Sequence, residues 1–127
     1  MQQFTRTAML FIEKTLRDCE SCPGFSGAAL SSPDGLMLAM QGEISGDEAA
    51  ACASSLFIDS STALSYIGES DPKMMLLWTK TKVLILHQLT DGSILLITST
   101  EINSYHTVLK FSLDIAKKLN HAVSVLS

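Results

Sequence analysis

The sequence predicts an α+β domain built on one five-stranded antiparallel sheet, with helices on both faces. The expected order is helix, strand, strand, helix, strand, strand, strand, helix. Short apolar runs of strand length are joined by tight turns, which makes neighbouring strands antiparallel because a parallel crossover needs about a dozen residues or more. Three longer segments repeat their apolar residues at helical spacing instead. We expect a single domain over residues 1–127, without repeats or linkers.

The first helix is expected between Phe4 and Cys19, where apolar residues recur on one helical face, and the Pro-Gly pair that follows ends it. Two strands come next, Phe25–Ser31 and Leu36–Gln41, around a Ser-Pro-Asp-Gly turn. Proline presets the dihedral of the second turn position, and Gly35 supplies the positive φ that lets the second strand leave. These residues therefore predict a hairpin.

A long middle helix is expected from Gly46 to Ile67, closed by Gly68 in the left-handed conformation. The run Ser45 to Glu48 has the pattern of a capping box, in which each side chain bonds the other residue's amide. The apolar stripe of this helix is wide and rich in small residues: Ala49, Ala50, Cys52, Ala53, Leu56, Phe57, Ala63, Leu64 and Ile67. Such a stripe predicts close packing on two sides, against the sheet and against a second surface.

Three strands are expected at Lys73–Thr79, Val83–Leu89 and Ser93–Ser99, followed by a helix capped by Asn103 or Ser104. The first of these strands is apolar at both parities, whereas a strand with one wet face should alternate. It should be covered on both faces or lie at an interface, because an exposed edge of this kind promotes aggregation. Together with the small-residue helix, it makes a symmetric homodimer the economical interpretation.

Bulk composition excludes several classes of function. The 127 residues are 46% apolar and carry a net charge of −4, and scattered basic residues argue against nucleic acid and anionic membrane surfaces. No apolar run is long enough to span a membrane, and no secretion signal is evident. Three cysteines, an odd number, do not form a disulfide framework. We therefore expect a cytoplasmic protein without membrane insertion.

Few residues offer chemistry. Cys19 and Cys22 form a C-x-x-C, but at a helix C-terminus the helix dipole disfavours the thiolate, so a structural role is favoured over a redox or metal site. A nucleophilic pair of Cys52 with His87 is conceivable, although Cys52 falls within the apolar stripe. Phosphate-binding glycine motifs are absent. We expect no catalytic residue, no cofactor and no metal, and hence no enzyme.

The chain resembles the roadblock family, the dynein light chain and bacterial polarity-regulator group. The matching residues are PGFSGAALSSPDGL at Pro23–Leu36, the alanine-rich helix from Ala49, Gly68, DPKMM at Asp71–Met75 and DGSILL at Asp91–Leu96. The resemblance implies a roadblock/profilin-like sandwich that forms a homodimer through its third strands, with the two middle helices side by side. It also implies a non-catalytic platform that regulates or scaffolds a small Ras-like GTPase.

Two sets of residues are expected to form the interfaces of this protein. The dimer interface is expected at Ala53, Leu56, Phe57, Met74, Met75, Leu76, Leu77 and Trp78. The partner-binding face, carried over from the resemblance, comprises Ala51, Ser54, Ser55, Ile58, Thr62 and Ser65. The alternatives are a small-ligand sensor whose pocket is lined by methionines and Trp78, a general protein-interaction adaptor, and a redox or hydrolytic enzyme that uses the cysteines.

Overall fold

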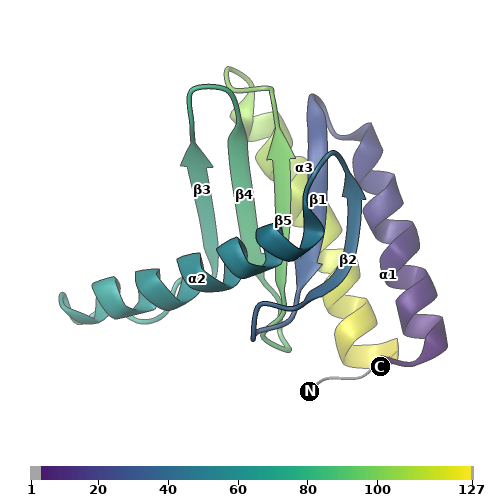
Figure 1. The fold of residues 1–127 in the computed structure, drawn as a ribbon, viewed down its shortest axis with the longest axis horizontal. Helices are drawn as coiled ribbons and strands as arrows, with labels where there is room; N and C mark the ends of the chain where they lie inside the picture. Colours follow the sequence, from purple (N-terminus) through teal and green to yellow (C-terminus); the bar gives the residue numbers. More distant parts are fainter. Residues whose placement is uncertain (1–3, 127) are drawn as a thin grey trace.

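The structure, a computed structural model, describes residues 4–126 and confirms the predicted α+β architecture (Figure 1). The helices are α1 (Arg6–Asp18), α2 (Gly46–Ser65) and α3 (Tyr105–His121). The strands are β1 (Phe25–Ser31), β2 (Met37–Gly42), β3 (Met74–Trp78), β4 (Val83–Gln88) and β5 (Ile94–Ser99). Short helical turns, η1 (Cys19–Ser21) and η2 (Ala122–Leu126), extend α1 and α3.

The five strands form one antiparallel sheet in the order β2-β1-β5-β4-β3. The edges of the sheet are therefore β2 and β3. Helices α1 and α3 cover one face, and α2 crosses the other (Figure 1). Within residues 4–126, no helix combines the length and apolar character needed to cross a bilayer.

Alternation along the strands divides the core into two clusters. Leu30, Leu95 and Ile97 belong to the larger cluster, beneath α1 and α3. Their sequence neighbours Ala29 and Leu96 point the opposite way, into the cluster beneath α2. Small side chains on the inner side of α2 let that helix lie close to the sheet: Gly46, Ala49, Ala50 and Ala53.

The hairpin turn has the predicted glycine conformation and, in addition, a serine side-chain bond that was not predicted. Gly35 has a φ of +87°, its amide donates to the Ser32 carbonyl at 3.1 Å, and the Leu36 amide donates to Ser32 Oγ at 3.1 Å. The turn therefore uses both the glycine conformation and a serine side chain, which turn residues supply for these separate reasons.

The two ends of α2 differ in how well they were predicted. At the C-terminal end Gly68 has a φ of +75°, and the Glu69 amide donates to the Leu64 carbonyl at 3.0 Å, as in a Schellman motif. At the other end the capping-box prediction is wrong, because the Ser45 side chain makes no capping hydrogen bond. Ser45 has a ψ of 105°, whereas Thr5, whose hydroxyl does cap α1, has a ψ of 161°.

Candidate interaction surface

Helix α2 is longer than the part of the sheet that it covers, and Figure 1 shows its C-terminal half projecting beyond β3. Ser60 Oγ donates to Met75 Sδ at 3.3 Å, which marks where the helix passes the edge strand. Beyond that point Tyr66 is 83% exposed and Ile67 is 73% exposed. The predicted apolar stripe is thus buried only in its first half, because no strand within residues 4–126 lies beneath the second.

The exposed stripe residues correct the sequence interpretation. The sequence pattern places Ala63 and Ile67 on the buried side of the helix, yet both are exposed past the edge of the sheet. Cys52 is also exposed, although it lies in the covered half of α2. Helical spacing identifies which side of a helix is apolar, but the position of the sheet edge decides how far that side is covered.

Strand β3 is an edge strand without a charged side chain. Met75 and Leu77 pack toward the α2 cluster and Leu76 toward the cluster beneath α1 and α3, and all three are only partly buried. Trp78 is 53% exposed and meets the Tyr105 ring edge-on at a centroid distance of 4.7 Å. Both faces of β3 are therefore apolar, as the sequence indicated, but within this chain neither is fully covered.

The outer edge of β3 has backbone N–H and C=O groups that face away from β4 and can pair with another strand. The Gln88 amide donates to the Lys73 carbonyl at 2.8 Å, which shows which residues of β3 direct their backbone groups toward β4. Because alternate residues of an antiparallel strand direct their backbone groups to opposite sides, Met74, Leu76 and Trp78 direct theirs away from β4. An uncharged edge of this kind is a template for another strand.

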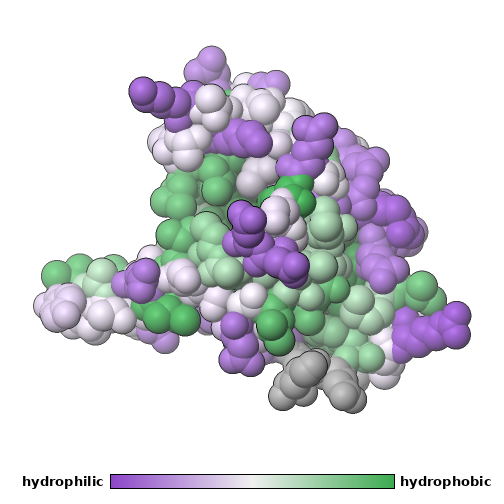
Figure 2. Space-filling model, viewed as in Figure 1, coloured by the Kyte–Doolittle hydropathy of each residue, from purple (hydrophilic) through white to green (hydrophobic). Residues whose placement is uncertain are grey.

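Next to this edge lies apolar surface on the α2 side of the sheet. Figure 2 shows it above the projecting half of α2, over β3 and β4. The partly buried side chains that border the α2 cluster there are Leu56, Met75, Leu77 and Leu84. We call these four residues the open floor.

The structure divides the expected dimer-interface residues into two groups. Ala53 is 1% exposed and Phe57 is 5% exposed, and both pack within the chain's own core beneath α2. Leu56 and the residues of β3 remain at least partly accessible. Within the accessible group, Leu56, Met75 and Leu77 belong to the open floor, whereas Leu76 and Trp78 face the α3 side of the sheet.

The expected partner-binding residues lie on the outer side of α2 with one exception. Five of them are exposed: Ala51, Ser55, Ile58, Thr62 and Ser65. Ser54 is buried and donates to the Pro33 carbonyl at 3.0 Å, because the β1–β2 turn packs against α2 at this point. A hollow of about 350 Å³ opens beside this contact, between Ile58 and Thr62 on the helix and Pro33 on the turn. The periodicity of the sequence does not predict this contact, because it reports only which side of the helix is apolar.

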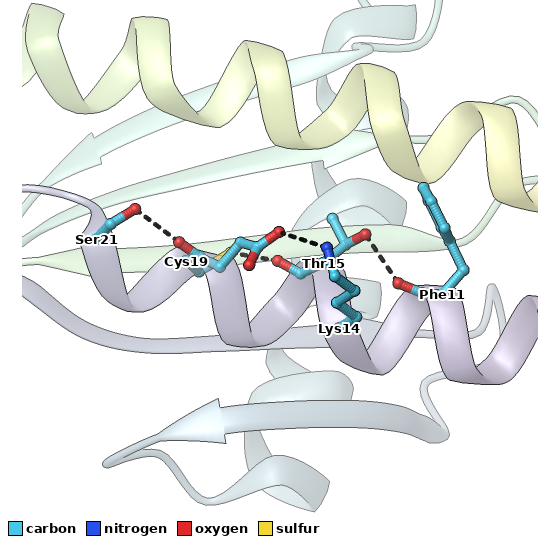
Figure 3. A network of polar contacts seen from close by, with 6 residues as sticks. Phe11, Lys14, Thr15, Cys19 and Ser21 are labelled. Atoms are coloured by element: carbon cyan, nitrogen blue, oxygen red, sulfur yellow. Dashed lines mark hydrogen bonds and ion pairs between the residues drawn. The ribbon is translucent and has the colours of Figure 1, made fainter.

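The C-x-x-C cysteines are buried and structural in their surroundings. Figure 3 shows Cys19 within a chain of contacts along α1, where its thiol donates to the Thr15 carbonyl at 3.7 Å and Thr15 Oγ1 donates to the Phe11 carbonyl at 2.8 Å. Burial raises the pKa of Cys19 to about 12 and that of Cys22 to about 11. Both thiols are therefore protonated at neutral pH, which makes them poor nucleophiles and poor metal ligands.

His87 is buried on the opposite face of the sheet from α2, and its Nε2 lies 2.8 Å from Ser112 Oγ on α3. Ser112 Oγ also lies 2.7 Å from the Leu109 carbonyl, to which it donates. Burial lowers the pKa of His87. Because Cys52 lies on α2, the sheet separates it from His87, and the conceivable nucleophilic pair is not formed. Among the described residues no group of His, Cys, Asp and Glu has the arrangement of a metal site.

The ligand-pocket alternative receives no support from the geometry. Trp78 packs against Tyr105 of α3, whereas Met75 contacts Ser60 of α2. These two expected lining residues lie on opposite faces of the sheet and do not share a pocket.

Comparison with known families identifies the fold. The model of the Roadblock/LC7 domain matches residues 11–99, which is more than half of the chain. The chain belongs to the Roadblock/LC7 family. The match extends from α1 to the end of β5, so it contains the whole sheet of this roadblock domain together with α2. No curated protein matches the sequence.

Solved structures of other roadblock proteins resemble this domain. Myxococcus xanthus MglB has a TM-score of 0.86 and 12% identity, over 100% of this chain and 97% of that one. The gliding protein mglB of Thermus thermophilus has a TM-score of 0.84 and 13% identity, over 94% and 93%. A Roadblock/LC7 domain from Streptomyces avermitilis has a TM-score of 0.69 and 19% identity, over 86% and 92%. At these identities the likeness shows the fold.

Proposed function

We propose that this roadblock domain is a non-catalytic homodimeric platform that regulates or scaffolds a small Ras-like GTPase. The observation that carries the proposal is the apolar edge at β3, beside which half of α2 projects without a covering surface. The buried, protonated cysteines and the separation of Cys52 from His87 are consistent with a binding role.

The backbone of β3 favours one geometry for the dimer. Met74, Leu76 and Trp78 direct their backbone groups outward, so antiparallel pairing of the whole strand with its copy sets Leu76 opposite Leu76 and Met74 opposite Trp78. The two sheets then become continuous. The projecting half of each α2 extends over the open floor of the other protomer and covers Leu77 and Leu84.

Membership of the family and the outer side of α2 support a GTPase as the proposed partner. Ile58 is 60% exposed, and it is the large apolar residue among the five exposed residues expected to bind the partner. Ile58 adjoins the hollow that Thr62 also lines, and an apolar side chain of the partner could bind in this hollow. In interfaces a few such central anchors supply most of the binding energy.

The dimer is tested by charge at the centre of the edge. Leu76→Glu places two carboxylates opposite each other in the proposed pairing, so light scattering should give a dimer mass for the wild type and a monomer mass for the variant. The matched control is Met40→Glu on the opposite edge strand β2, which should remain dimeric. A monomeric wild type, or a dimeric Leu76→Glu, would contradict the proposal.

The partner is tested with Ras-like GTPases from the same organism, each loaded with GDP or with a non-hydrolysable GTP analogue. We expect one of them to bind in at least one nucleotide state and Ile58→Glu to abolish that binding. Leu113→Glu is the control, because Leu113 is 50% exposed on α3, on the other face of the sheet. Absence of any complex and of any change in hydrolysis or exchange would argue against the GTPase.

A further inference from the structure

The opposite edge of the sheet, at β2, is also open. The proposed dimer uses β3, so the continuous sheet would end in a β2 strand on each side. Strand β2 runs Met37–Gly42 without a charged residue or proline, and Met37 and Met40 are each 38% exposed. Charges and proline are the usual means by which edge strands avoid further pairing.

The backbone of β2 offers a defined row of donors and acceptors. The Glu43 amide donates to the Ser26 carbonyl at 2.9 Å, so Ser26 and Glu43 form a hydrogen-bonded pair of the β1–β2 ladder. From this pair along β2, the backbone groups of successive residues point alternately toward β1 and away from it. Met40 therefore directs both its N–H and its C=O outward, and Gly42 directs its N–H outward. The Gly42 carbonyl already accepts from the Ile44 amide at 3.1 Å. Only an extended chain presents groups that pair with such a row.

A groove runs along this edge. A hollow of about 330 Å³ is lined by residues 37–41, the length of the open strand, and by Glu13 and Arg17 of α1. A second hollow of about 370 Å³ begins at the adjoining Gly42 and includes Glu20 and Glu43. The first hollow follows β2, so a strand added there has space for its side chains, and the second, which Phe25, Ser26 and Thr100 also line, lies across the end of the sheet.

The charge around the groove is acidic. Every charged residue within 18–72 is Asp or Glu, and the Lys and Arg residues lie in α1, in α3 and around β3. This corrects the expectation that basic residues are scattered. Three glutamates, Glu13, Glu20 and Glu43, line the two hollows, against Arg17 in the first hollow and Lys82, whose Nζ donates to Ser26 Oγ at 2.9 Å beside the second. An added strand would therefore be favoured by lysine or arginine and disfavoured by further acids.

We propose that the β2 edge binds an extended, basic segment of a partner protein, which adds to the sheet as a further strand. The main-chain bonds to Met40 and Gly42 give the affinity, and the glutamates select the charge. The site is separate from the outer side of α2, and each protomer carries a complete copy. It therefore does not depend on the GTPase or on dimerisation.

The probe is a short labelled peptide in which Lys alternates with Val. Two matched peptides accompany it, one with Glu in place of each Lys and one with N-methylated central residues, which cannot donate to the edge. Binding to the full chain is measured by fluorescence anisotropy, and the perturbed amides are mapped by NMR. We expect the Lys peptide to perturb the amides of Met40 and Gly42, the N-methylated peptide to bind about tenfold more weakly, and the Glu peptide not to bind.

Three variants separate backbone pairing from charge. Met40→Pro removes an outward N–H and leaves the β1 ladder intact, so it should weaken binding about tenfold. Glu43→Lys should weaken it severalfold and Glu48→Lys, an exposed acid on α2, should leave it unchanged. If Met40→Pro fails to fold by circular dichroism, the N-methylated peptide and Glu43→Lys decide the question.

Absence of binding by the Lys peptide, equal binding of the N-methylated peptide, or shifts confined to Met74–Trp78 would overturn the proposal. Loss of GTPase binding or of dimerisation in separate experiments would leave this result unaffected, because neither the peptide nor the β2 variants touch those surfaces.

Discussion

Replacement of Phe57 by alanine tests where the middle helix is buried within one chain. Phe57 is 5% exposed and packs with Leu86 and Leu96 beneath α2. Removal of a buried phenylalanine side chain costs roughly 3–5 kcal/mol of the free energy of unfolding, through lost burial and the cavity left behind. For a chain of this size that corresponds to a fall in Tm of roughly 10–20 °C.

The matched control is Leu56→Ala. Leu56 is only partly buried in the chain and belongs to the open floor, so its replacement should cost roughly 1–2 kcal/mol in the monomer. Urea unfolding followed by circular dichroism gives both values. Measured at low and high protein concentration, the cost of Leu56→Ala should grow with concentration as the proposed dimer forms. A cost below about 1 kcal/mol for Phe57→Ala would refute its placement in the core.

Three further predictions follow from buried groups and from one turn. Because burial lowers the pKa of His87, the unfolded chain takes up a proton that the folded chain resists, so stability should fall as the pH drops below 6.5. Urea midpoints between about pH 7.5 and about pH 5 should therefore show a shallower slope for His87→Gln than for the wild type, and equal slopes would contradict this. A thiol reagent at mildly alkaline pH should modify Cys52 in the native protein, and Cys19 and Cys22 only after unfolding, as peptide mass mapping would show. Gly68→Ala should lower the free energy of unfolding by about 1–2 kcal/mol from the strain of its positive φ alone, since an added Cβ there meets no atom within 4 Å; a neutral result in urea unfolding would exclude that strain.

Local chemistry explains why most of the fold was predictable. The strand ends and the hairpin turn depend on alternation and on residues such as Gly35, whose conformational role is visible in the sequence itself. The end of α2 at Gly68 was predictable for the same reason. The capping box was not, because Ser45 has the right residue type but a backbone rotation that no sequence pattern records.

The interaction surface was predictable only in part, because it depends on how elements are placed against each other. The apolar character of β3 at both parities predicted a strand covered on both faces or lying at an interface; within one chain both faces are only partly covered, and the interface stays a prediction. The burial of Ser54 depends on a turn 21 residues away in the sequence, at Pro33, and the exposure of Ile67 depends on where the sheet ends. The β2 groove was missed, although the lack of basic residues over 18–72 was a readable signal.

The strand order has a consequence for how the chain folds. Every neighbouring pair in the sheet is joined by a short turn except β1 and β5, which are separated by α2, β3 and β4. The protein is thus two locally closed units, a hairpin and a three-stranded meander, held together along one seam where Leu30 pairs with Leu95. Pairing β1 with β5 brings together residues far apart in the sequence, and this step has the largest loss of loop entropy in the fold. It therefore governs the folding rate. Substitutions along the seam should slow folding, whereas those in the turns should act mainly on unfolding.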